Sequence, residues 1–434
     1  MTNEARFLRA ERDQTRWDFI DLEALLPSDH RARIVWAFVE SLDLSALYDA
    51  IKSREGGAGR PPPDPAVMLA LWLYAAIEGV WSARELDRLA ERDLAYRWIA
   101  GGVALNYHGL GDFRVEHGEV FDRLLTESVT ALIAEGTVSL AEIGIDGTKV
   151  RANASRGSFK TGEQLEQIEA GVGRRLAALT AEIEKDPEAC SRRKRAARER
   201  AAREVTARAE RARAALERVR AEKEKRAKKH PGEKANKKPD PKASISDADA
   251  RSMHFADGAV RPGYNAQIAA TPKEGIILSV EMTDRRNDSG LAAAMVDDLV
   301  RRYGKTPERL LVDTHYAPRE DIAALAEHPA GPVTVYAPPP RERESISARG
   351  LANRQRKRAR EPESVKEWRH RMAMSAGQEV YRHRKLIERV NAHLKNHGFG
   401  FMPVRGLIKV KAVALLHALA NNLLAAYRLR AKAA

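Results

Sequence analysis

Residues 138–148, VSLAEIGIDGT, form a short apolar run that ends in Asp146 and Gly147. Apolar runs of this length that end at a turn signal are typical of buried strands. A second such run, RLLVDTHY at 309–316, contains Asp313 directly after LLV. Functional groups of an α/β sheet lie just beyond the carboxyl edge of its strands, so both carboxylates are candidates for a site. Taken singly, an Asp at such a position is more often a helix cap or a turn residue.

The sequence around these two runs predicts the rest of a sheet. Residues 263–283, GYNAQIAATPKEGIILSVEMT, predict two strands joined by a loop around Pro272–Gly275, and GPVTVYAP at 331–338 predicts another strand. Helix-like stretches at 288–303 and 318–327 lie on either side of RLLVD. Paired strands followed by alternating helix and strand indicate an α/β sheet with mixed pairing.

The first 138 residues predict an all-α region, with helices expected at 64–79, 81–102 and 117–136. Ser82 and Glu85 form a capping box at the start of the second of these helices. Short helices joined by tight turns suit a helix-turn-helix-like module that binds DNA. A plain helical bundle without DNA contact fits the spacing equally well.

A long charged insertion, about 156–245, separates the first predicted strand from the second. It is rich in Ala, Arg, Glu and Lys, has few large apolar residues, and ends in HPGEKANKKPDPK. This composition predicts a solvated or coiled-coil-like helical arm with a disordered end. A solvated helical face and an arm that lies along DNA both remain open from the sequence.

The charge of the chain favours a polyanionic partner. The formal net charge is +14 and the isoelectric point is near 9.8. Lys and Arg that neutralise phosphates release condensed counterions, so nucleic acid is the first candidate, with an anionic membrane as the alternative. No spanning apolar run or secretory signal is evident, and Cys190 is the only cysteine, which excludes an intramolecular disulfide and a thiolate zinc cluster. We expect a cytoplasmic protein without membrane contact.

A third acidic candidate lies in QEVYRHRKLIERVNAHLK, a segment of helical composition between Gly377 and Lys395. At about 100° per residue, its polar residues share one stripe some 60° wide: Tyr381, Arg384, Glu388 and Lys395, with Asn391 beside it. The stripe is either a functional face or the wet side of a basic amphipathic helix. Helical spacing alone does not separate the two.

The spacing Tyr-x2-Arg-x3-Glu-x6-Lys resembles the signature of bacterial insertion-sequence transposases with a DDE triad. Other stretches resemble the same family in the same order: GRPPPDPAVMLALWLYA (59–75), ERDLAYRWIAGG (91–102), IDGTKVRANAS (145–155), SDADARSM (246–253), GYNAQ (263–267), ND (287–288) and the closing segment 405–430. The resemblance covers most of the chain and is weakest across the charged insertion.

The resemblance implies a ribonuclease-H-like mixed sheet flanked by helices, interrupted by the insertion and preceded by an all-α domain. The expected domains are a DNA-binding region at 1–138, a catalytic region at 139–155 and 246–430, and the basic insertion at 156–245. Asp146, Asp313 and Glu388 are then the catalytic residues and the ligands of two Mg²⁺ or Mn²⁺ ions per active site. Such ions can stabilise the attacking and leaving oxygens of an in-line displacement.

The resemblance also implies the reaction and the partners. The enzyme is expected to bind the terminal inverted repeats of its element, cleave DNA as an endonuclease and join the freed 3′-OH to target DNA. Arg384 and Lys395 are placed to bind phosphates. Tyr381 is expected to stack on or bond to the DNA end, and Asn391 is a further DNA-contact candidate. A homodimer on double-stranded DNA is expected, without a nucleotide cofactor because GxxxxGK[ST] is absent.

Three alternatives remain open at this stage. A metal-dependent nuclease of the same fold would cleave DNA without joining it. A catalytically silent DNA-binding descendant of a transposase would bind DNA without metal and cut nothing. An RNA-binding scaffold built on the basic arm would leave the acidic positions unexplained. The sequence does not give the DNA end or target sequences, the free oligomeric state, the activity of this copy, or whether excision passes through hairpins.

Overall fold

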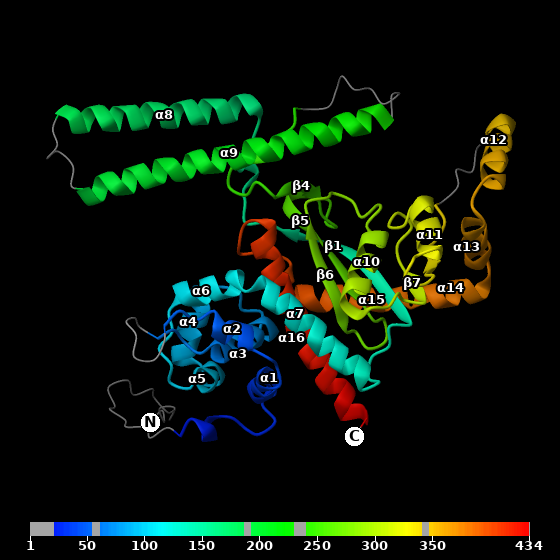
Figure 1. The fold of residues 1–434 in the computed structure, drawn as a ribbon, viewed down its shortest axis with the longest axis horizontal. Coiled ribbons are helices and arrows are strands. Elements are labelled where there is room, and N and C mark those ends of the chain that lie inside the picture. Colours follow the sequence, from blue (N-terminus) through cyan, green and yellow to red (C-terminus); the bar gives the residue numbers. More distant parts are fainter. Residues whose placement is uncertain (1–20, 54–60, 186–191, 230–239, 341–346, 434) are drawn as a thin grey trace, which may run out of the picture.

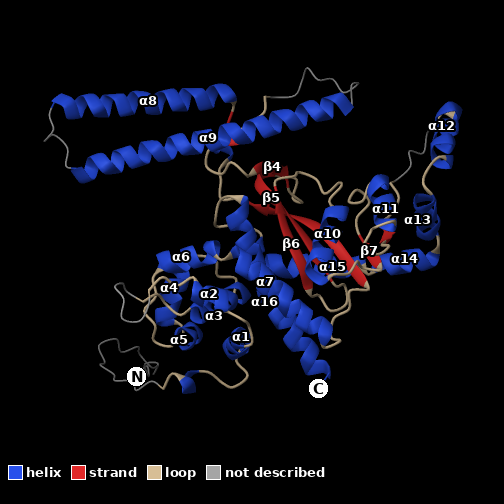
Figure 2. Cartoon of the chain, viewed as in Figure 1, coloured by secondary structure: helices blue, strands red, loops and turns tan. Residues whose placement is uncertain are grey.

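The computed structural model describes residues 21–53, 61–185, 192–229, 240–340 and 347–433. A mixed sheet lies at its centre, with a group of short helices on one side and a long helical hairpin above it (Figure 1). Helices surround the sheet on several sides (Figure 2). The first 20 residues, Cys190 and most of the predicted disordered end at 230–242 lie outside the described residues.

The N-terminal part and the insertion are helical. Their elements are η1 (Glu23–Leu25), α1 (Arg31–Glu40), α2 (Ser45–Asp49), α3 (Pro65–Ile77), α4 (Ala83–Arg92), α5 (Leu94–Ala100), α6 (Tyr107–Glu116), α7 (Gly118–Ala134), η2 (Arg156–Ser158), α8 (Gly162–Lys185) and α9 (Arg192–Lys229). The later helices are α10 (Ala292–Tyr303), α11 (Arg319–Ala326), α12 (Ala348–Ala359), α13 (Glu363–Ala373), α14 (Ser375–Arg382), α15 (Arg384–Leu394), η4 (Lys395–Phe399) and α16 (Leu407–Ala433).

The strands form one mixed sheet and one short pair. They are β1 (Glu142–Arg151), β2 (Phe159–Lys160), β3 (Ala243–Ser244), β4 (Arg251–His254), β5 (Val260–Ala270), β6 (Ile277–Thr283), β7 (Arg309–Leu311) and β8 (Thr334–Tyr336). The main sheet has the order β4-β5-β1-β7-β8, with β6 also paired to β5. β5 is antiparallel to β1, whereas β7 is parallel to β1 and to β8. This mixed topology is ribonuclease-H-like, and the predicted fold class is confirmed.

The sequence placed most elements correctly but merged some. Ser82 caps α4 by accepting a hydrogen bond from the amide of Glu85, as the capping box predicts. The helix expected at 81–102 is two helices, because Asp93 is extended and its side chain caps α5 instead. The single helix expected between Gly377 and Lys395 is likewise divided, at His383, into α14 and α15. β4 was not predicted as a strand.

The closing helix α16 is the centre of the packing. By length and composition it could cross a membrane, but 72% of its apolar window is buried inside the protein. It packs on α7, on α3 and on β6, so it contacts both the N-terminal helices and the sheet. One hydrophobic cluster accordingly runs from Leu26 to Ala426 through both regions. The apolar surface of α16 is therefore explained by burial in the core.

The insertion forms an antiparallel hairpin of α8 and α9, as the predicted coiled-coil-like arm requires (Figure 1). Its packing is thin, with a separate small core made of Leu165, Ala212, Ala215, Leu216 and Ala243. The side chain of Arg251 on β4 ties the base of the arm to the sheet. It pairs with Glu222 of α9 at 2.9 Å and with Asp284 at 2.9 Å, and only 7% of it is exposed.

A buried ionic cluster joins α10 to α7. The Arg302 side chain on α10 is 1% exposed and pairs with Asp298 at 2.7 Å and with Asp122 of α7 at 2.6 Å. Burial alone would raise the pKa of Asp298, but hydrogen bonds from Ser279 and Arg302 outweigh it, so the pKa is lowered. The cluster therefore stabilises the folded protein with Asp298 ionised.

Candidate active site

The candidate site lies where β1 and β7 separate. The two strands pair only between Glu142–Gly144 and Arg309–Leu311. Asp146 lies two residues past the last pair on β1, and Asp313 follows β7 by two residues. Because the strands are parallel, both carboxylates belong to the same end of the sheet. Asp313 follows the end of its strand, as predicted. The prediction was wrong for Asp146, because β1 continues to Arg151 and pairs with β5 along this length, so Asp146 lies inside the strand and only its pairing with β7 has ended.

Helix α15 comes unusually close to β1 at Gly144. A Cβ atom at this position would lie 2.2 Å from Cγ1 of Ile387, so no side chain fits without moving the helix. Ile387 is fully buried. The close approach places the next residue of α15, Glu388, near enough to Asp146 for one arginine, Arg384, to bond to both. The glycine two residues before the acidic position is therefore a requirement of the site.

Direct contacts then join β1 to α15. Arg384 donates from Nη2 to Oδ1 of Asp146 at 2.8 Å and from Nη1 to Oε1 of Glu388 at 2.8 Å. Asn391 donates from Nδ2 to Oδ2 of Asp146 at 2.8 Å. Both oxygens of Asp146 are thus held by α15. One guanidinium connects two of the three acidic residues, which are 242 positions apart in the chain.

The electrostatics of the site follow from burial and close charges. Burial raises the pKa of Asp146, and Glu388 and Asp288 raise it further, while Arg384 and Asn391 lower it. Burial alone would lower the pKa of Arg384, but the carboxylates of Asp146, Asp313 and Glu388 help to raise it. All three acidic residues therefore act on this one guanidinium.

Asp313 and Tyr381 lie at the margin of this contact network. Asp313 is exposed, and its Oδ1 accepts a hydrogen bond from the amide of Thr314 at 2.7 Å. Burial raises the pKa of the half-buried Tyr381, to which Asp313, Glu388 and Asp146 also contribute. The tyrosine thus faces the same acidic group. The neighbouring His315 is exposed, in keeping with a surface histidine.

Lys395 has a different setting from the rest of the predicted stripe. It is the first residue of the π-helical turn η4, beyond the end of α15, and its side chain is exposed. Within this turn Gly398 leaves the helical conformation, with a φ of 91°. Within the described part of the chain Lys395 contacts none of the three carboxylates. The structure therefore joins Asp146, Glu388, Arg384 and Asn391 by hydrogen bonds. Lys395 lies outside this contact network, at what we call the rim of the site.

One polar cluster beside the site received no role from the sequence. Oδ1 of Asp288 accepts hydrogen bonds from Asn265 at 2.6 Å and from Gln267 at 2.9 Å, and lies 3.5 Å from Nζ of Lys149. A Cβ on Gly147 would lie 2.4 Å from the same oxygen. These residues belong to the stretches IDGTK, GYNAQ and ND, which resemble the family's motifs. The sequence therefore pointed to these residues, but it did not predict what they do.

The acidic residues suit a hard divalent cation by their chemistry. Asp146, Asp313 and Glu388 offer only oxygen ligands, which Mg²⁺ and Mn²⁺ prefer. Glu388 is accessible, with 57% of its side chain exposed, whereas only 18% of the Asp146 side chain is exposed. Among the described residues, no three His, Cys, Asp or Glu side chains already form a ligand group. Arg384 holds the oxygens of Asp146 and Glu388 that face each other, so a cation between them requires this side chain to turn away.

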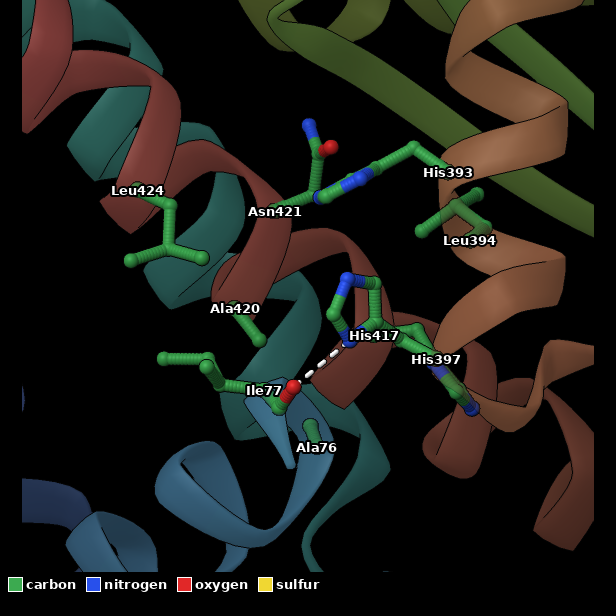
Figure 3. Close-up of a pocket in the computed structure, with 9 residues that line it drawn as sticks. All are labelled: Ala76, Ile77, His393, Leu394, His397, His417, Ala420, Asn421 and Leu424. Atoms are coloured by element: carbon green, nitrogen blue, oxygen red, sulfur yellow. Dashed lines mark hydrogen bonds between the residues drawn. The ribbon is translucent and has the colours of Figure 1, made fainter. Parts of the chain in front are cut away.

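A second polar cluster lies at the joint between α3, η4 and α16 (Figure 3). His397 hydrogen-bonds through Nδ1 to the carbonyl of Ile77 at 2.6 Å, and Trp81 donates to the carbonyl of His397 at 2.9 Å. The ring of His417 stacks on Trp81 with centroids 3.6 Å apart. Burial, followed by His397, holds the pKa of His417 well below its ordinary value. These contacts are structural and lie apart from the acidic residues.

Comparison with known families identifies the class of protein. Residues 226–423 match the family described as Transposase DDE domain, and residues 20–115 match the Transposase domain (DUF772). The two matches together span about two-thirds of the chain. No curated protein and no solved structure matches the chain. The chain belongs to the DDE transposases of insertion sequences.

The matched DDE segment begins inside α9, so it does not include β1. The structure accounts for this boundary, because the hairpin arm separates β1 from the other strands in sequence. In space β1 pairs with both β5 and β7 and is central to the sheet. DDE transposases use divalent metal ions, in agreement with the oxygen-only chemistry of the three acidic residues.

Proposed function

We propose that this protein cleaves the ends of a bacterial insertion sequence and joins them to target DNA, with Asp146, Asp313 and Glu388 as its catalytic residues. One observation supports this proposal most strongly. Arg384 bonds directly to Asp146 on β1 and to Glu388 on the same helix, and Asp313 on the neighbouring strand acts on the same guanidinium. A surface helix with a merely wet face would not bury its arginine against a strand carboxylate.

The same three carboxylates are proposed to hold two Mg²⁺ or Mn²⁺ ions. When bound, these ions would supply positive charge to the phosphate oxygens on which negative charge develops. Asn391 fixes the orientation of Asp146 by its hydrogen bond to Oδ2. Gly144 lets α15 approach closely enough for this bond to form.

The cationic residues are proposed to act on the DNA. Arg384 bridges Asp146 and Glu388 in the free protein, and its planar fork suits a phosphate once it turns from them. Lys395 at the rim is proposed to contact a phosphate next to the cleaved bond. Tyr381 is half-buried beside the acidic group, where its ring can pack on a terminal base. In each step a phosphorus–oxygen bond forms to water or to a 3′-OH, and one phosphorus–oxygen bond breaks.

The partners follow from this reaction. The helical N-terminal region is proposed to bind the inverted repeats as double-stranded DNA, in a homodimer that brings two ends together. The cytoplasm, where bacterial DNA lies, is the proposed place of action. We propose no membrane contact, because α16 uses its apolar surface within the core, and no nucleotide cofactor.

The test is cleavage and strand transfer on labelled duplexes that carry the two ends of the element. Wild type and Asp313→Asn are compared with Mg²⁺, with Mn²⁺ and with EDTA. We expect metal-dependent cleavage and joining by wild type and neither by the variant. Cleavage without joining would identify a nuclease instead. Binding without cleavage under all conditions would identify a silent descendant of a transposase.

A further inference from the structure

The positive charge of the protein is concentrated on one helix of the arm. Helix α9 contains 17 Lys and Arg against six Asp and Glu, an excess of 11 positive charges. Its partner α8 contains three Lys and Arg against five Asp and Glu. The formal net charge of the whole chain is +14. The two helices of one hairpin therefore differ in charge, and α9 alone accounts for most of the excess.

The basic residues of α9 include a defined outer face. The residues that α9 buries are Ala209, Ala212, Ala215, Leu216 and Val219. At about 100° per residue, six exposed basic residues lie roughly opposite this stripe, in a sector some 100° wide. These six are Arg200, Arg203, Arg211, Arg218, Lys225 and Lys228, and we call them the α9 basic face. Arg218 also pairs with Asp249 at 3.3 Å, near the base of the arm. One acidic residue, Glu210, lies in the same sector.

The composition of the α9 basic face does not suit a second protein helix. Apart from Glu210, the residues between its Arg and Lys side chains are small: Ala196, Ala207, Ala214 and Ala221. The larger apolar residues Leu216 and Val219 are already buried in the hairpin. A coiled-coil partner needs an apolar seam on both helices, and this face has none. A row of cations with small residues between them instead suits the phosphate backbone of nucleic acid.

The length of this face matches a duplex. Arg200 and Lys228 are 28 residues apart in the helix, or about 42 Å at 1.5 Å per residue. One turn of B-DNA spans roughly 34–36 Å. Arg203 and Arg211 form no ion pair with the described carboxylates, and both are exposed. These two guanidinium groups are therefore available to phosphates in the half of the face nearer Arg200, about 12 Å apart along the helix.

The arm is attached to the same sheet that carries the candidate active site, at the β4 edge. Glu222 of α9 pairs with Arg251, which also pairs with Asp284. The segment that begins at Asp284 leads within a few residues to Asp288, whose carboxylate is bonded to Asn265 and Gln267 on β5. In Figure 1, α9 crosses above the β4 end of the sheet. A duplex on α9 would thus be held at a fixed place relative to β1.

We propose that the α9 basic face binds the backbone of duplex DNA without sequence preference and holds it beside the catalytic sheet. This proposal rests on the proposed function for its choice of ligand. The contact differs from recognition of the element ends, which is proposed for the N-terminal helices. Since phosphate contacts position a duplex and carry no sequence information, the arm provides affinity and orientation.

The test is the salt dependence of binding by the full-length protein to a random-sequence duplex of about 30 base pairs, without divalent metal. The variant Arg203→Gln/Arg211→Gln removes two charges from the α9 basic face. Its matched control, Arg174→Gln/Arg175→Gln, removes two exposed charges from α8. Gln is a good helix former, so both hairpins should keep their helices, as circular dichroism will check.

We expect the α9 variant to lose at least about tenfold in affinity at low salt. The slope of log K against log salt should fall by about 1.8, because each lost phosphate contact removes about 0.9. The α8 control should change affinity less than about twofold. Equal losses in both variants would overturn the proposal, as would no loss in either. A change of oligomeric state in the α9 variant with unaltered DNA affinity would assign the face to a second copy instead. Because binding is measured without metal, a failure of catalysis leaves this result interpretable.

Discussion

The charged residues at the end of β1 and those along α9 are arranged in opposite ways. At β1, Arg384 bonds to two carboxylates and Asn391 completes the shell of Asp146, mostly out of solvent. Along α9, basic side chains are exposed and outnumber acidic ones. Paired charges in a partly buried site are strongly held and sensitive to single changes, whereas exposed charges act together and are screened by salt. Substitutions should therefore affect chemistry at one place and affinity at the other.

The largest expected effect concerns the candidate active site, where a substitution should change catalysis and not DNA affinity. Asp146→Asn should reduce cleavage by at least about 1,000-fold, which is roughly 4 kcal/mol of barrier, because an amide is a poor ligand for a divalent ion. Affinity for end DNA without metal should stay within about twofold of wild type. Single-turnover cleavage and fluorescence anisotropy measure the two quantities. As a control, Asp257→Asn changes an exposed carboxylate on a turn and should alter neither.

Arg302 extends the comparison to buried charges that serve stability alone. Arg302→Met removes the buried cation that Asp298 and Asp122 share and leaves them only the exposed Arg301, so it should lower the free energy of unfolding by roughly 3 kcal/mol. The lowered pKa of Asp298 means that its stabilising effect is present above the unfolded pKa near 4 and is lost as pH falls through the folded value. Denaturant titrations at pH 7 and at a pH below the folded pKa of Asp298 should therefore differ less for the variant than for wild type.

The measurement has a clear contrary result. If the variant unfolds at the same denaturant concentration as wild type at pH 7, the cluster does not stabilise the joint between α10 and α7. If the folded variant cleaves more slowly per molecule, the cluster is not purely structural.

Gly144 tests whether the acidic residues depend on the approach of α15 to β1. Gly144→Ala places a Cβ against Ile387 and should cost about 1–3 kcal/mol of unfolding free energy. Thermal unfolding measures the loss. The double variant Gly144→Ala/Ile387→Ala should lose less than the sum of the two single changes, because the clash is removed. Gly173→Ala, in open space on α8, is the control and should not destabilise. Strict additivity would contradict the proposed contact.

The smallest expected effect concerns His417, a titratable group kept neutral in the core. Its pKa is lowered by burial, so below the unfolded value of about 6.5 only the unfolded chain takes up the proton. Stability should then decline by up to about 1.4 kcal/mol per pH unit for this one group as pH falls. His417→Gln should flatten this decline, even if the variant is less stable at pH 7. An unchanged pH dependence would show that His417 is not the responsible group.

The sequence predicted the elements of the site better than their contacts. Asp146 and Asp313 became candidates because each follows an apolar run, and Glu388 because polar residues share a helical stripe; their catalytic role stays a prediction. The bonds between Arg384 and the two carboxylates could not be predicted, since they join α15 to a strand more than 200 residues earlier. Arg384 was expected to face phosphates, and its role between carboxylates emerged only from the fold.

Other features depend on tertiary packing in a similar way. Gly144 looked like part of an apolar run, yet its missing side chain sets the distance between α15 and β1. Asp93 divides a predicted helix, because its side chain caps the second half by accepting hydrogen bonds from backbone amides. A residue that caps a helix in this way has an extended backbone, so the first helix cannot continue through it. Asp288 was visible only as part of a family-like motif until the sheet placed Asn265 and Gln267 beside it.

The most direct test of the central claim uses element-end DNA that is already cleaved and carries a free 3′-OH. Strand transfer into a target duplex is measured with Mg²⁺ and with Mn²⁺ for wild type and Glu388→Gln, with DNA binding recorded on the same samples. We predict metal-dependent joining by wild type and a loss of at least about 1,000-fold in the variant, with binding unchanged. Joining by Glu388→Gln at the wild-type rate would contradict the assignment of this residue and of the site built around Arg384.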